Sequence, residues 1–178
     1  DEVESLPEQA WSGQEYLFAV KRFDRGPRRE LIHIEDMAQV RGFYPDQKYT
    51  GSFETIGALV YRNHDAEALR EFVRRLAFNI LIGNGDAHLK NWSLIYRDPC
   101  IPTLAPAYDL VATFVYRPLV EGAEEMALPF GRSKRFEDMR ISTFDRLDAK
   151  LGAKAALGDV VRTLVERVVA EWPQAAAV

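Results

Sequence analysis

Apolar residues recur at three- and four-residue steps between Asp65 and Gly83, and this is the clearest periodic pattern in the chain. The residues on the repeating face are Leu69, Phe72, Val73, Leu76, Ala77 and Ile80. This spacing places them on one side of a helix, where they can be buried together. Asp65 can cap the start of the helix, and Gly83 can close it beyond Leu81. The pattern therefore predicts an amphipathic helix that ends directly before the polar segment 84–91.

Most other predicted elements are short. Residues 1–15 are acidic and polar, which indicates a lead-in, and residues 16–24 are predicted to form a buried strand that turns polar at its end. Phe53, Ile56, Leu59 and Val60 indicate another helix. The remaining predictions are a short helix over 34–40 ended by Gly42, a connection over 45–51, and a β-hairpin formed by 92–96 and 101–104.

Helices are predicted to dominate the C-terminal part, over residues 143–172. The first would cover 143–151 with Gly152 after it, and the second 156–172 with Pro173 as its stop. The apolar stripe of the second helix, which we interpret as core packing, consists of Leu157, Val160, Leu164, Val168 and Trp172. The predicted fold class is mainly α with a small β-hairpin (α+β), with one globular unit over 16–178.

Composition and charge narrow the classes of protein to consider. The chain has 178 residues, of which 47% are hydrophobic, so it is long and apolar enough to form a core. We expect no transmembrane helix and no signal peptide, and the single cysteine, Cys100, fits a reducing, cytoplasmic setting. A net charge of -4 argues against direct contact with nucleic acid, and the basic clusters at 25–29 and 132–135 are interpreted as solvated loops.

The segment Asn84-Gly85-Asp86-Ala87-His88-Leu89-Lys90-Asn91 concentrates chemically active side chains directly after the apolar helix. Burying such groups costs several kcal/mol unless each is paired, so packing explains them poorly. Asp86 and Asn91 are five positions apart, which is the separation that protein kinases use between the aspartate at the substrate hydroxyl and an asparagine at the magnesium ion. The segment therefore predicts a catalytic loop for phosphoryl transfer.

A second metal ligand is expected after a hairpin. Asp109 is so placed, within the predicted metal-binding loop 105–111. Two oxygen ligands from separate loops could hold Mg²⁺ against phosphate oxygens.

A structural interpretation of the same residues stays open. Asp86 could cap a turn, His88 could be a structural histidine, and Asn91 could occupy a left-handed conformation. His33 and His64 are isolated and are interpreted as structural or surface residues. The sequence holds no zinc-binding cluster, no Walker A loop and no Gly-x-Ser-x-Gly elbow.

The loop resembles the catalytic loops of several kinase-fold families, including the aminoglycoside and choline kinases, but its surroundings resemble HipA-type serine/threonine protein kinases most. The segments that carry the resemblance are Val20-Lys21-Arg22-Phe23-Asp24-Arg25, Glu35-Asp36-Met37, Lys48-Tyr49 and Pro106-Ala107-Tyr108-Asp109-Leu110. The resemblance implies a protein-kinase-like C-terminal lobe. It also implies ATP and Mg²⁺ as cofactors, a serine or threonine hydroxyl on a protein as substrate, and a HipB-like, DNA-binding antitoxin as partner.

The resemblance also assigns a role to each matching residue. Asp86 would be the catalytic aspartate, and Asn91 and Asp109 would bind Mg²⁺. The residues that would contact ATP are Lys21, Arg22 and Phe23 at the adenine-binding hinge, and His88, Lys90 and Tyr108 at the phosphates.

Three departures from protein kinases accompany the resemblance. Gly85 stands where Arg precedes the catalytic aspartate, and Leu110-Val111 stands where Phe-Gly would follow Asp109. Only 22 residues precede Phe23, and the chain lacks a Gly-rich loop and a strand bearing the ATP lysine. The N-terminal lobe is therefore expected to be largely missing, which predicts weak Mg-ATP binding and little transfer by this chain alone.

Two other functions stay open at this point. A small-molecule kinase of the aminoglycoside or choline type would use the same loop. A non-catalytic interaction module, with an antitoxin or a separately encoded N-terminal lobe as its partner, would not need Asp86, Asn91 and Asp109 together.

Overall fold

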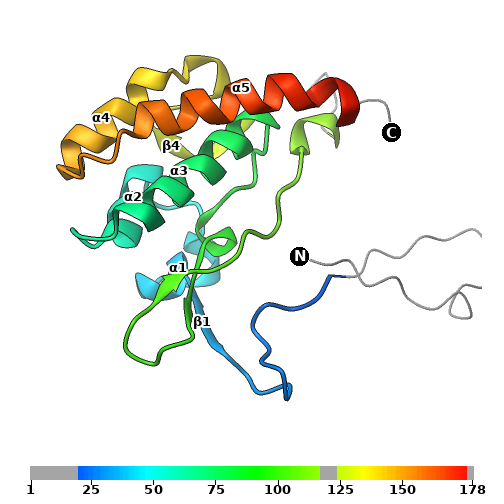
Figure 1. Ribbon diagram of the computed structural model, residues 1–178, viewed down its shortest axis with the longest axis vertical. Helices are drawn as coiled ribbons and strands as arrows, with labels where there is room; N and C mark the ends of the chain where they lie inside the picture. Colours follow the sequence, from blue (N-terminus) through cyan, green and yellow to red (C-terminus); the bar gives the residue numbers. More distant parts are fainter. Residues whose placement is uncertain (1–19, 117–123, 176–178) are drawn as a thin grey trace, which may run out of the picture.

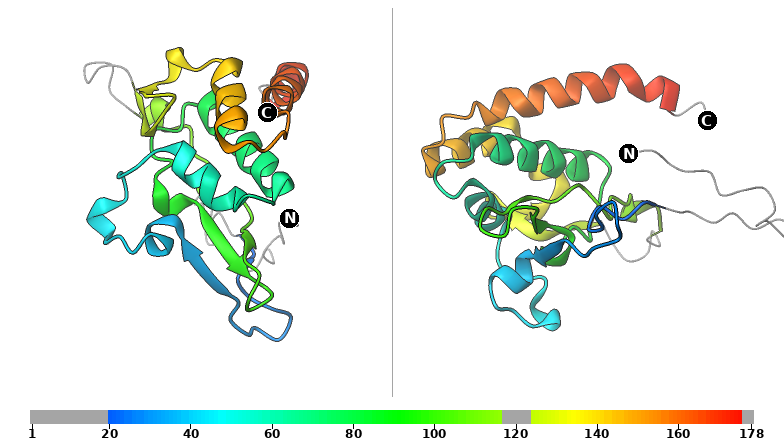
Figure 2. Two further views of the ribbon diagram at one scale, coloured as in Figure 1. Left: turned by 90° about the vertical axis from the view of Figure 1, so that its left-hand side faces the viewer. Right: turned by 60° about the horizontal axis from the view of Figure 1, so that its bottom comes forward.

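The computed structural model describes residues 20–116 and 124–175, so the predicted lead-in 1–15 and residues 16–19 of the predicted strand lie outside the described residues. A group of helices lies on one side of the molecule and a small antiparallel sheet on the other (Figures 1 and 2). The helices are α1 (Met37–Val40), α2 (Phe53–Tyr61), α3 (Ala66–Leu81), α4 (Ile141–Leu151) and α5 (Leu157–Ala175). The strands are β1 (His33–Asp36), β2 (Ser93–Tyr96), β3 (Thr103–Leu104), β4 (Glu125–Phe130) and β5 (Ser133–Arg135). The predicted fold class is confirmed.

The helix predicted from the clearest pattern is α3. Asp65 Oδ1 accepts a hydrogen bond of 2.9 Å from the backbone N–H of Ala68, as expected of an N-cap. Gly83 adopts a positive φ of 64° beyond the last turn, which a glycine does without steric cost. All six residues of the predicted face lie in or against the main core, and α5 packs alongside α3 (Figure 2).

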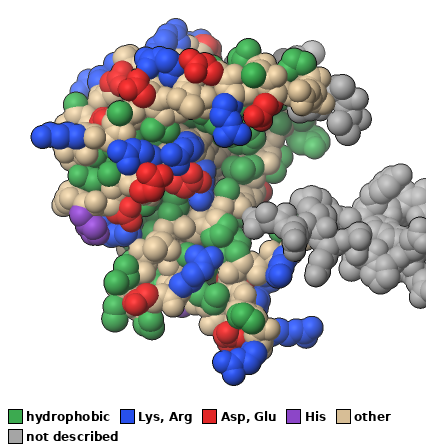
Figure 3. Space-filling view, in the orientation of Figure 1, with side chains coloured by type: hydrophobic (Ala, Val, Ile, Leu, Met, Phe, Trp, Pro, Cys, Tyr) green, Lys and Arg blue, Asp and Glu red, His purple; other side chains and the backbone are tan. Residues whose placement is uncertain are grey.

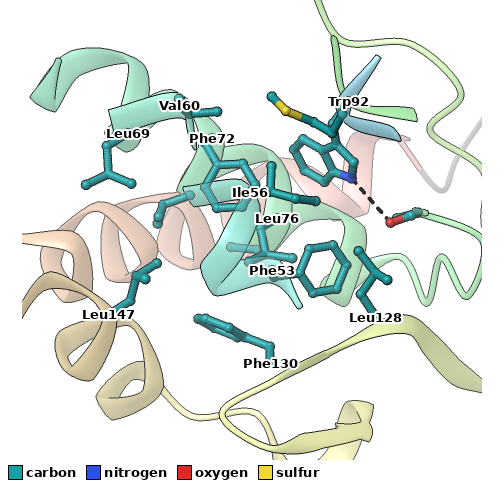
Figure 4. Close-up of a cluster of buried hydrophobic side chains, with 14 of the residues drawn as sticks. Phe53, Ile56, Val60, Leu69, Phe72, Leu76, Trp92, Leu128, Phe130 and Leu147 are labelled. Carbon is teal, nitrogen blue, oxygen red and sulfur yellow. Dashed lines mark hydrogen bonds between the residues drawn. The ribbon is translucent and has the colours of Figure 1, made fainter. Parts of the chain in front are cut away.

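Aromatic and aliphatic side chains from several elements meet beneath α3 and form the main core (Figure 4). The Phe72 ring packs edge-on against Trp92, with centroids 4.9 Å apart, and Phe53 approaches the same indole at 6.1 Å. Trp92 directly follows Asn91, so the residue next to the end of the predicted catalytic loop is buried in the core. The core thereby fixes the position of the loop.

The short helix predicted over 34–40 is partly wrong, because its first residues form β1 instead. β1 pairs antiparallel with β2, and β3 completes a sheet of order β1-β2-β3. The helix α1 starts only after Asp36, whose side chain accepts a hydrogen bond of 2.8 Å from Gln39 N. Local sequence could not show the pairing with β2, because the paired residues are far apart in the chain, from 57 positions for Asp36–Ser93 to 63 positions for His33–Tyr96.

The predicted strand over 16–24 is not observed in its described part. Val20 is 63% exposed, the chain turns at Phe23 and Asp24, and residues 20–24 pair with no strand in the described ranges. Charged groups hold this segment instead. Arg22 and Arg25 both bind the carboxylate of Asp24, at 2.5 and 2.7 Å.

A second hairpin, made of β4 and β5, was absent from the prediction. Pro129 inside β4 argues against a strand in the sequence, and the hairpin buries Phe130 against Phe144, with ring centroids 4.9 Å apart. Its turn uses Gly131 and Arg132, both at positive φ. Arg132 and Arg135 thus belong to a hairpin rather than to a simple loop.

The helix α5 is longer than predicted, because it continues through Pro173 to Ala175. Its apolar stripe is buried only at the start. Leu157 is fully buried, whereas Trp172 is 61% exposed, so the core interpretation is wrong for that end.

On the face seen in Figure 3, acidic and basic side chains interleave over the helices. Ion pairs of 3.1–3.2 Å join Glu67 to Arg70 and Glu71 to Arg74 on α3. Among the described residues, no helix combines the length and apolarity that crossing a membrane would need.

Candidate phosphotransfer site

The loop 84–91 begins at the end of α3 and is held by hydrogen bonds within its own backbone. His88 N donates to Asp86 O over 2.7 Å, and Asn91 N donates to His88 O over 3.0 Å. Leu89 is fully buried, and the indole N–H of Trp92 donates to Ala87 O over 3.2 Å. The loop is therefore attached to the core at both its middle and its end (Figure 4).

Asn84 connects this loop to the predicted metal-binding loop. Its side chain is almost fully buried, and its amide group donates to Asn79 Oδ1 over 2.7 Å and to Asp109 O over 3.3 Å. Its carbonyl oxygen accepts a hydrogen bond of 3.0 Å from Asp86 N. One buried amide thus links α3, the Asp86 backbone and the Asp109 backbone, and it sets the two loops side by side.

Gly85 explains the first departure from protein kinases in steric terms. A Cβ atom at this position would lie 2.7 Å from the backbone oxygen of Glu125 and still closer to the Glu124 carboxylate. The Gly85 N–H donates to Thr113 Oγ1 over 2.6 Å. No side chain fits at residue 85 without movement of the backbone, so arginine cannot stand there.

The side chain of Asp86 reaches the surface, with 49% of it exposed. Its Oδ1 accepts a hydrogen bond of 2.7 Å from the hydroxyl of Tyr49. His88 Nε2 lies 3.8 Å from the same oxygen, too far for a hydrogen bond. A carboxylate so placed can receive a further donor from solvent or from a substrate.

Asn91 and Asp109 line the same small pocket, although they come from different loops. Asn91 Nδ2 donates to Asp86 O over 2.9 Å, so the amide oxygen of Asn91 is left to act as an acceptor. The carboxylate of Asp109 makes no hydrogen bond or ion pair with a described residue, and Asp109 adopts a left-handed backbone with φ 55°. An amide oxygen and a carboxylate are ligands that suit Mg²⁺. Within residues 20–116 and 124–175, no cluster of three or more His, Cys, Asp or Glu could hold a metal, so such an ion would need further ligands from a nucleotide or from water.

A neighbouring cleft of about 390 Å³ brings together five of the six residues predicted to contact ATP. They are Lys21, Arg22, Phe23, Lys90 and Tyr108, with Asp36 and Ser93 on its wall. The Phe23 and Tyr108 rings lie 5.9 Å apart. Tyr108 also lines the pocket of Asn91 and Asp109, so it joins the cleft to the predicted metal site.

Polar contacts hold the side of this cleft that is nearest to the catalytic loop. The Tyr108 hydroxyl donates to Lys90 O over 2.8 Å and shares a short hydrogen bond of 2.5 Å with Ser93 Oγ. Burial raises the pKa of Tyr108, so its hydroxyl remains protonated at neutral pH. Lys90 Nζ lies 3.6 Å from Asp36 Oδ2, which leaves its ammonium within the cleft.

At the other side of the cleft, the two arginines around Asp24 shape the segment predicted to be the hinge. The hydrogen bond from Arg22 is the main reason that the pKa of Asp24 falls to about 2. Asp24 therefore stays ionised at neutral pH, and it holds residues 22–25 as a turn rather than as a strand.

His88, the sixth residue predicted to contact ATP, is placed differently. It is not among the residues that line the cleft, and its ring meets the edge of Tyr49, with centroids 5.3 Å apart. Burial lowers the pKa of His88, which favours the neutral ring. Its Nδ1 is buried without a hydrogen-bond partner among the described residues, so that atom has bonding capacity left for a ligand.

Several residues of the site had no assigned role in the sequence. Asp36 and Tyr49 occur in the segments that carry the family resemblance, and Asn84 is the first residue of the loop 84–91, but nothing in their spacing shows the contacts that they make with Lys90, Asp86 and Asp109. Asn79 and Thr113 lie outside these segments and bind Asn84 and Gly85. The one available signal for Asn79 was its position three residues after Leu76, next to the apolar face of the amphipathic helix α3.

Several known proteins are similar to this chain. Residues 3–172 match the family described as HipA-like C-terminal domain. A Sinorhizobium fredii protein named "Putative kinase Y4dM" is 45% identical over 178 residues, covering 97% of this chain and 42% of that protein. The serine/threonine-protein kinase toxin HipA of Shewanella oneidensis is 34% identical over 125 residues, covering 58% of this chain and 29% of that protein.

A solved structure shows the same similarity in three dimensions. It contains Shewanella oneidensis MR-1 HipA in complex with HipB and operator DNA. The TM-score is 0.69 at 25% sequence identity, over 88% of this chain and 40% of that one. In each of these three matches, the chain spans less than half the length of the matched protein.

Proposed function

Because the chain belongs to the family of HipA-like C-terminal domains, we propose that it is the catalytic lobe of a kinase that transfers the γ-phosphoryl group of ATP to a serine or threonine of a protein. Asp86 would serve as the proton acceptor, and Asn91 and Asp109 as ligands of Mg²⁺. The substrate class follows the name of the Shewanella oneidensis relative, which is a serine/threonine-protein kinase.

The observation that carries this proposal is the bridge made by Asn84. Its buried amide joins the backbones of Asp86 and Asp109, and Asn91 is bound in turn to the Asp86 carbonyl. Phosphoryl transfer requires a proton acceptor and a metal site at a fixed separation, because the rate depends on the alignment of the reacting atoms. A structural network alone would not need to place two carboxylates at the same edge with no Lys or Arg partner among the described residues.

Asp86 has the exposure that its proposed role requires. Its carboxylate is 49% exposed at the surface, so it can accept the hydrogen bond of an incoming hydroxyl. As the oxygen of that hydroxyl bonds to phosphorus and the bond to ADP breaks, the proton passes to Asp86.

Asn91 and Asp109 would hold the metal ion that accompanies ATP. The amide oxygen of Asn91 and the carboxylate of Asp109 border one pocket and are free of protein donors among the described residues. When bound there, Mg²⁺ would neutralise charge on the phosphate oxygens during transfer.

The nucleotide itself would occupy the cleft beside this pocket. Backbone groups of residues 21–23 would contact the adenine edge, and the ammonium of Lys90 would lie near the phosphates. His88 would contribute through Nδ1, which has no hydrogen-bond partner among the described residues, so that a bridging water could link it to a phosphate oxygen. Tyr108 would separate the adenine region from the metal site, because it borders both.

We further propose a HipB-like, DNA-binding antitoxin as the partner of the protein that carries this chain. The support is the similarity to HipA in its complex with HipB and operator DNA. The charge of the chain gives no reason to expect direct contact with the DNA.

Asp109→Asn tests the metal-binding part of the proposal. The substitution keeps the size of the side chain and removes the negative charge, so we expect the Kd of Mg-ATP to rise about tenfold in the whole gene product that carries this chain. Isothermal titration calorimetry measures this directly. Binding of ATP in the presence of EDTA should change less than twofold, because the lost contact is to the ion.

Asp98→Asn is the matched control, since Asp98 lies in the exposed turn between β2 and β3. It should bind Mg-ATP as the parent protein does. Equal affinities for the Asp109→Asn and parent proteins would contradict the assignment of Asp109 to the metal.

A further inference from the structure

The segment between α1 and α2 lies directly against the catalytic loop. Leu89 N donates a hydrogen bond of 3.0 Å to Lys48 O, so the backbone of this segment is attached one residue before Tyr49. The tether places Tyr49 beside Asp86, although 37 positions separate the two residues in the sequence.

The Tyr49 side chain is fixed at three points. Its hydroxyl donates to Asp86 Oδ1 over 2.7 Å, and its ring meets His88 edge-on, with 76° between the planes. Lys48 Nζ lies 4.9 Å from the ring centroid, at a distance where a cation is attracted to the ring. Tyr49 is nevertheless 46% exposed, so this arrangement is not explained by burial in a core.

The two carboxylate oxygens of Asp86 differ in their contacts. Oδ1 is held by Tyr49, whereas Oδ2 receives no hydrogen bond from any residue within 20–116 and 124–175. His88 Nε2 lies 3.8 Å from Oδ1, which is too far for a hydrogen bond, so Tyr49 is the one described side chain that donates to the carboxylate. An exposed carboxylate without a donor would rotate, and a rotating base is aligned with its substrate for only part of the time.

We propose that Tyr49 is a positioning residue, which holds Oδ1 of Asp86 so that Oδ2 faces the hydroxyl to be phosphorylated. This inference rests on the proposed function, since it assigns Tyr49 to the reaction for which Asp86 is the proton acceptor. Tyr49 does not itself touch the transferred group.

The chemistry of the phenol suits this task. The hydrogen bond to Asp86 is the main reason that the pKa of Tyr49 is raised, and burial adds to it. The hydroxyl therefore remains a donor throughout the neutral range. Phenylalanine would keep the ring contacts with His88 and Lys48 and would lose only the hydrogen bond.

The experiment compares the parent protein with Tyr49→Phe and Tyr44→Phe, using the whole gene product that carries this chain. Transfer from γ-³²P-ATP to the protein itself and to myelin basic protein gives kcat and the KM for ATP. We expect Tyr49→Phe to lower kcat about tenfold, as for loss of a hydrogen bond to a charged group, and to leave the KM for ATP within twofold. Tyr44 is an exposed tyrosine of the same segment, so Tyr44→Phe should match the parent protein in both constants.

A second measurement reports on the contact without any turnover. In protein labelled with ¹³C at the tyrosine ζ position, Asp86→Asn should lower the pKa of Tyr49, because the carboxylate that raises it is gone. Tyr44→Phe should leave the Tyr49 titration unchanged.

The outcomes separate this inference from the proposed function. An unaltered kcat in Tyr49→Phe, or a Tyr49 titration that Asp86→Asn does not shift, would overturn the positioning role and leave the kinase proposal intact. Absence of transfer by the parent protein to either acceptor would overturn the kinase proposal, and the positioning role with it.

Discussion

Asp86→Asn is expected to lower phosphoryl transfer by a factor of about 10² to 10⁴, the contribution that a well-placed general base makes to catalysis. Asparagine fills the same space, but it cannot accept the proton that leaves the substrate hydroxyl. Incorporation of ³²P from γ-³²P-ATP into protein, measured at saturating Mg-ATP, follows the loss.

The fold should tolerate this change, because the three hydrogen bonds of the Asp86 backbone are independent of its side chain. The carboxylate itself is half exposed and bonds only to Tyr49 among the described residues. We expect the melting temperature of Asp86→Asn to remain within about 2 °C of the parent, as for an exposed substitution.

Asp46→Asn is the control for the loss of one negative charge, since Asp46 is exposed on the neighbouring segment. It should retain the parent rate. A comparable rate in Asp86→Asn would mean that Asp86 is not the proton acceptor, and the structural interpretation of the loop would then be preferred.

Trp92→Ala is expected to lower the free energy of unfolding by about 3–5 kcal/mol, which is typical of a large buried aromatic residue. The indole is 4% exposed, packs edge-on against Phe53 and Phe72, and donates its N–H to Ala87 O. Removing it leaves a cavity and an unpaired carbonyl in the catalytic loop. Urea denaturation followed by circular dichroism measures the loss.

Trp172→Ala provides the matched comparison. Trp172 is 61% exposed near the end of α5, so its removal should cost less than about 0.5 kcal/mol. Similar losses for the two tryptophan variants would contradict the packing described for Trp92.

The two tryptophans also show what periodicity can and cannot predict. Periodicity correctly predicted α3, because its apolar face, its Asp65 cap and Gly83 all agree locally. The same reasoning placed Trp172 in a core, yet α5 extends past the body against which its first half packs. Whether an apolar stripe is covered depends on neighbouring elements, which one helix does not specify.

Strands were harder to predict than helices for a related reason. β1 exists because it pairs with β2, and residues 20–24 stay outside any strand because Arg22 and Arg25 bind Asp24 instead. β4 contains Pro129, which argues against a strand in the sequence. Each of these outcomes depends on contacts that the local pattern does not contain.

For the candidate site, sequence spacing predicted the reactive side chains but not the groups that hold them. Asp86, Asn91 and Asp109 could be proposed from the motif and its order along the chain. The contacts of Asn84, Asn79 and Tyr49 join residues that are 5 to 37 positions apart, and no regular spacing in the sequence predicts these contacts. The roles of the three reactive residues remain predictions, supported by their convergence.

The claim on which the kinase proposal most depends is that Asn91 and Asp109 share one ion, and paramagnetic relaxation tests it directly. In the whole gene product that carries this chain, bound to ATP, Mn²⁺ replaces Mg²⁺ while ¹⁵N signals are observed. We predict strong broadening of the Asn91 side-chain amide and of the Asp109 backbone amide, with the side-chain amide of Asn63 in the α2–α3 connection unaffected. If Mn²⁺ and ATP together broaden neither signal, or only one of the two, the shared metal site and the proposed mechanism would be wrong.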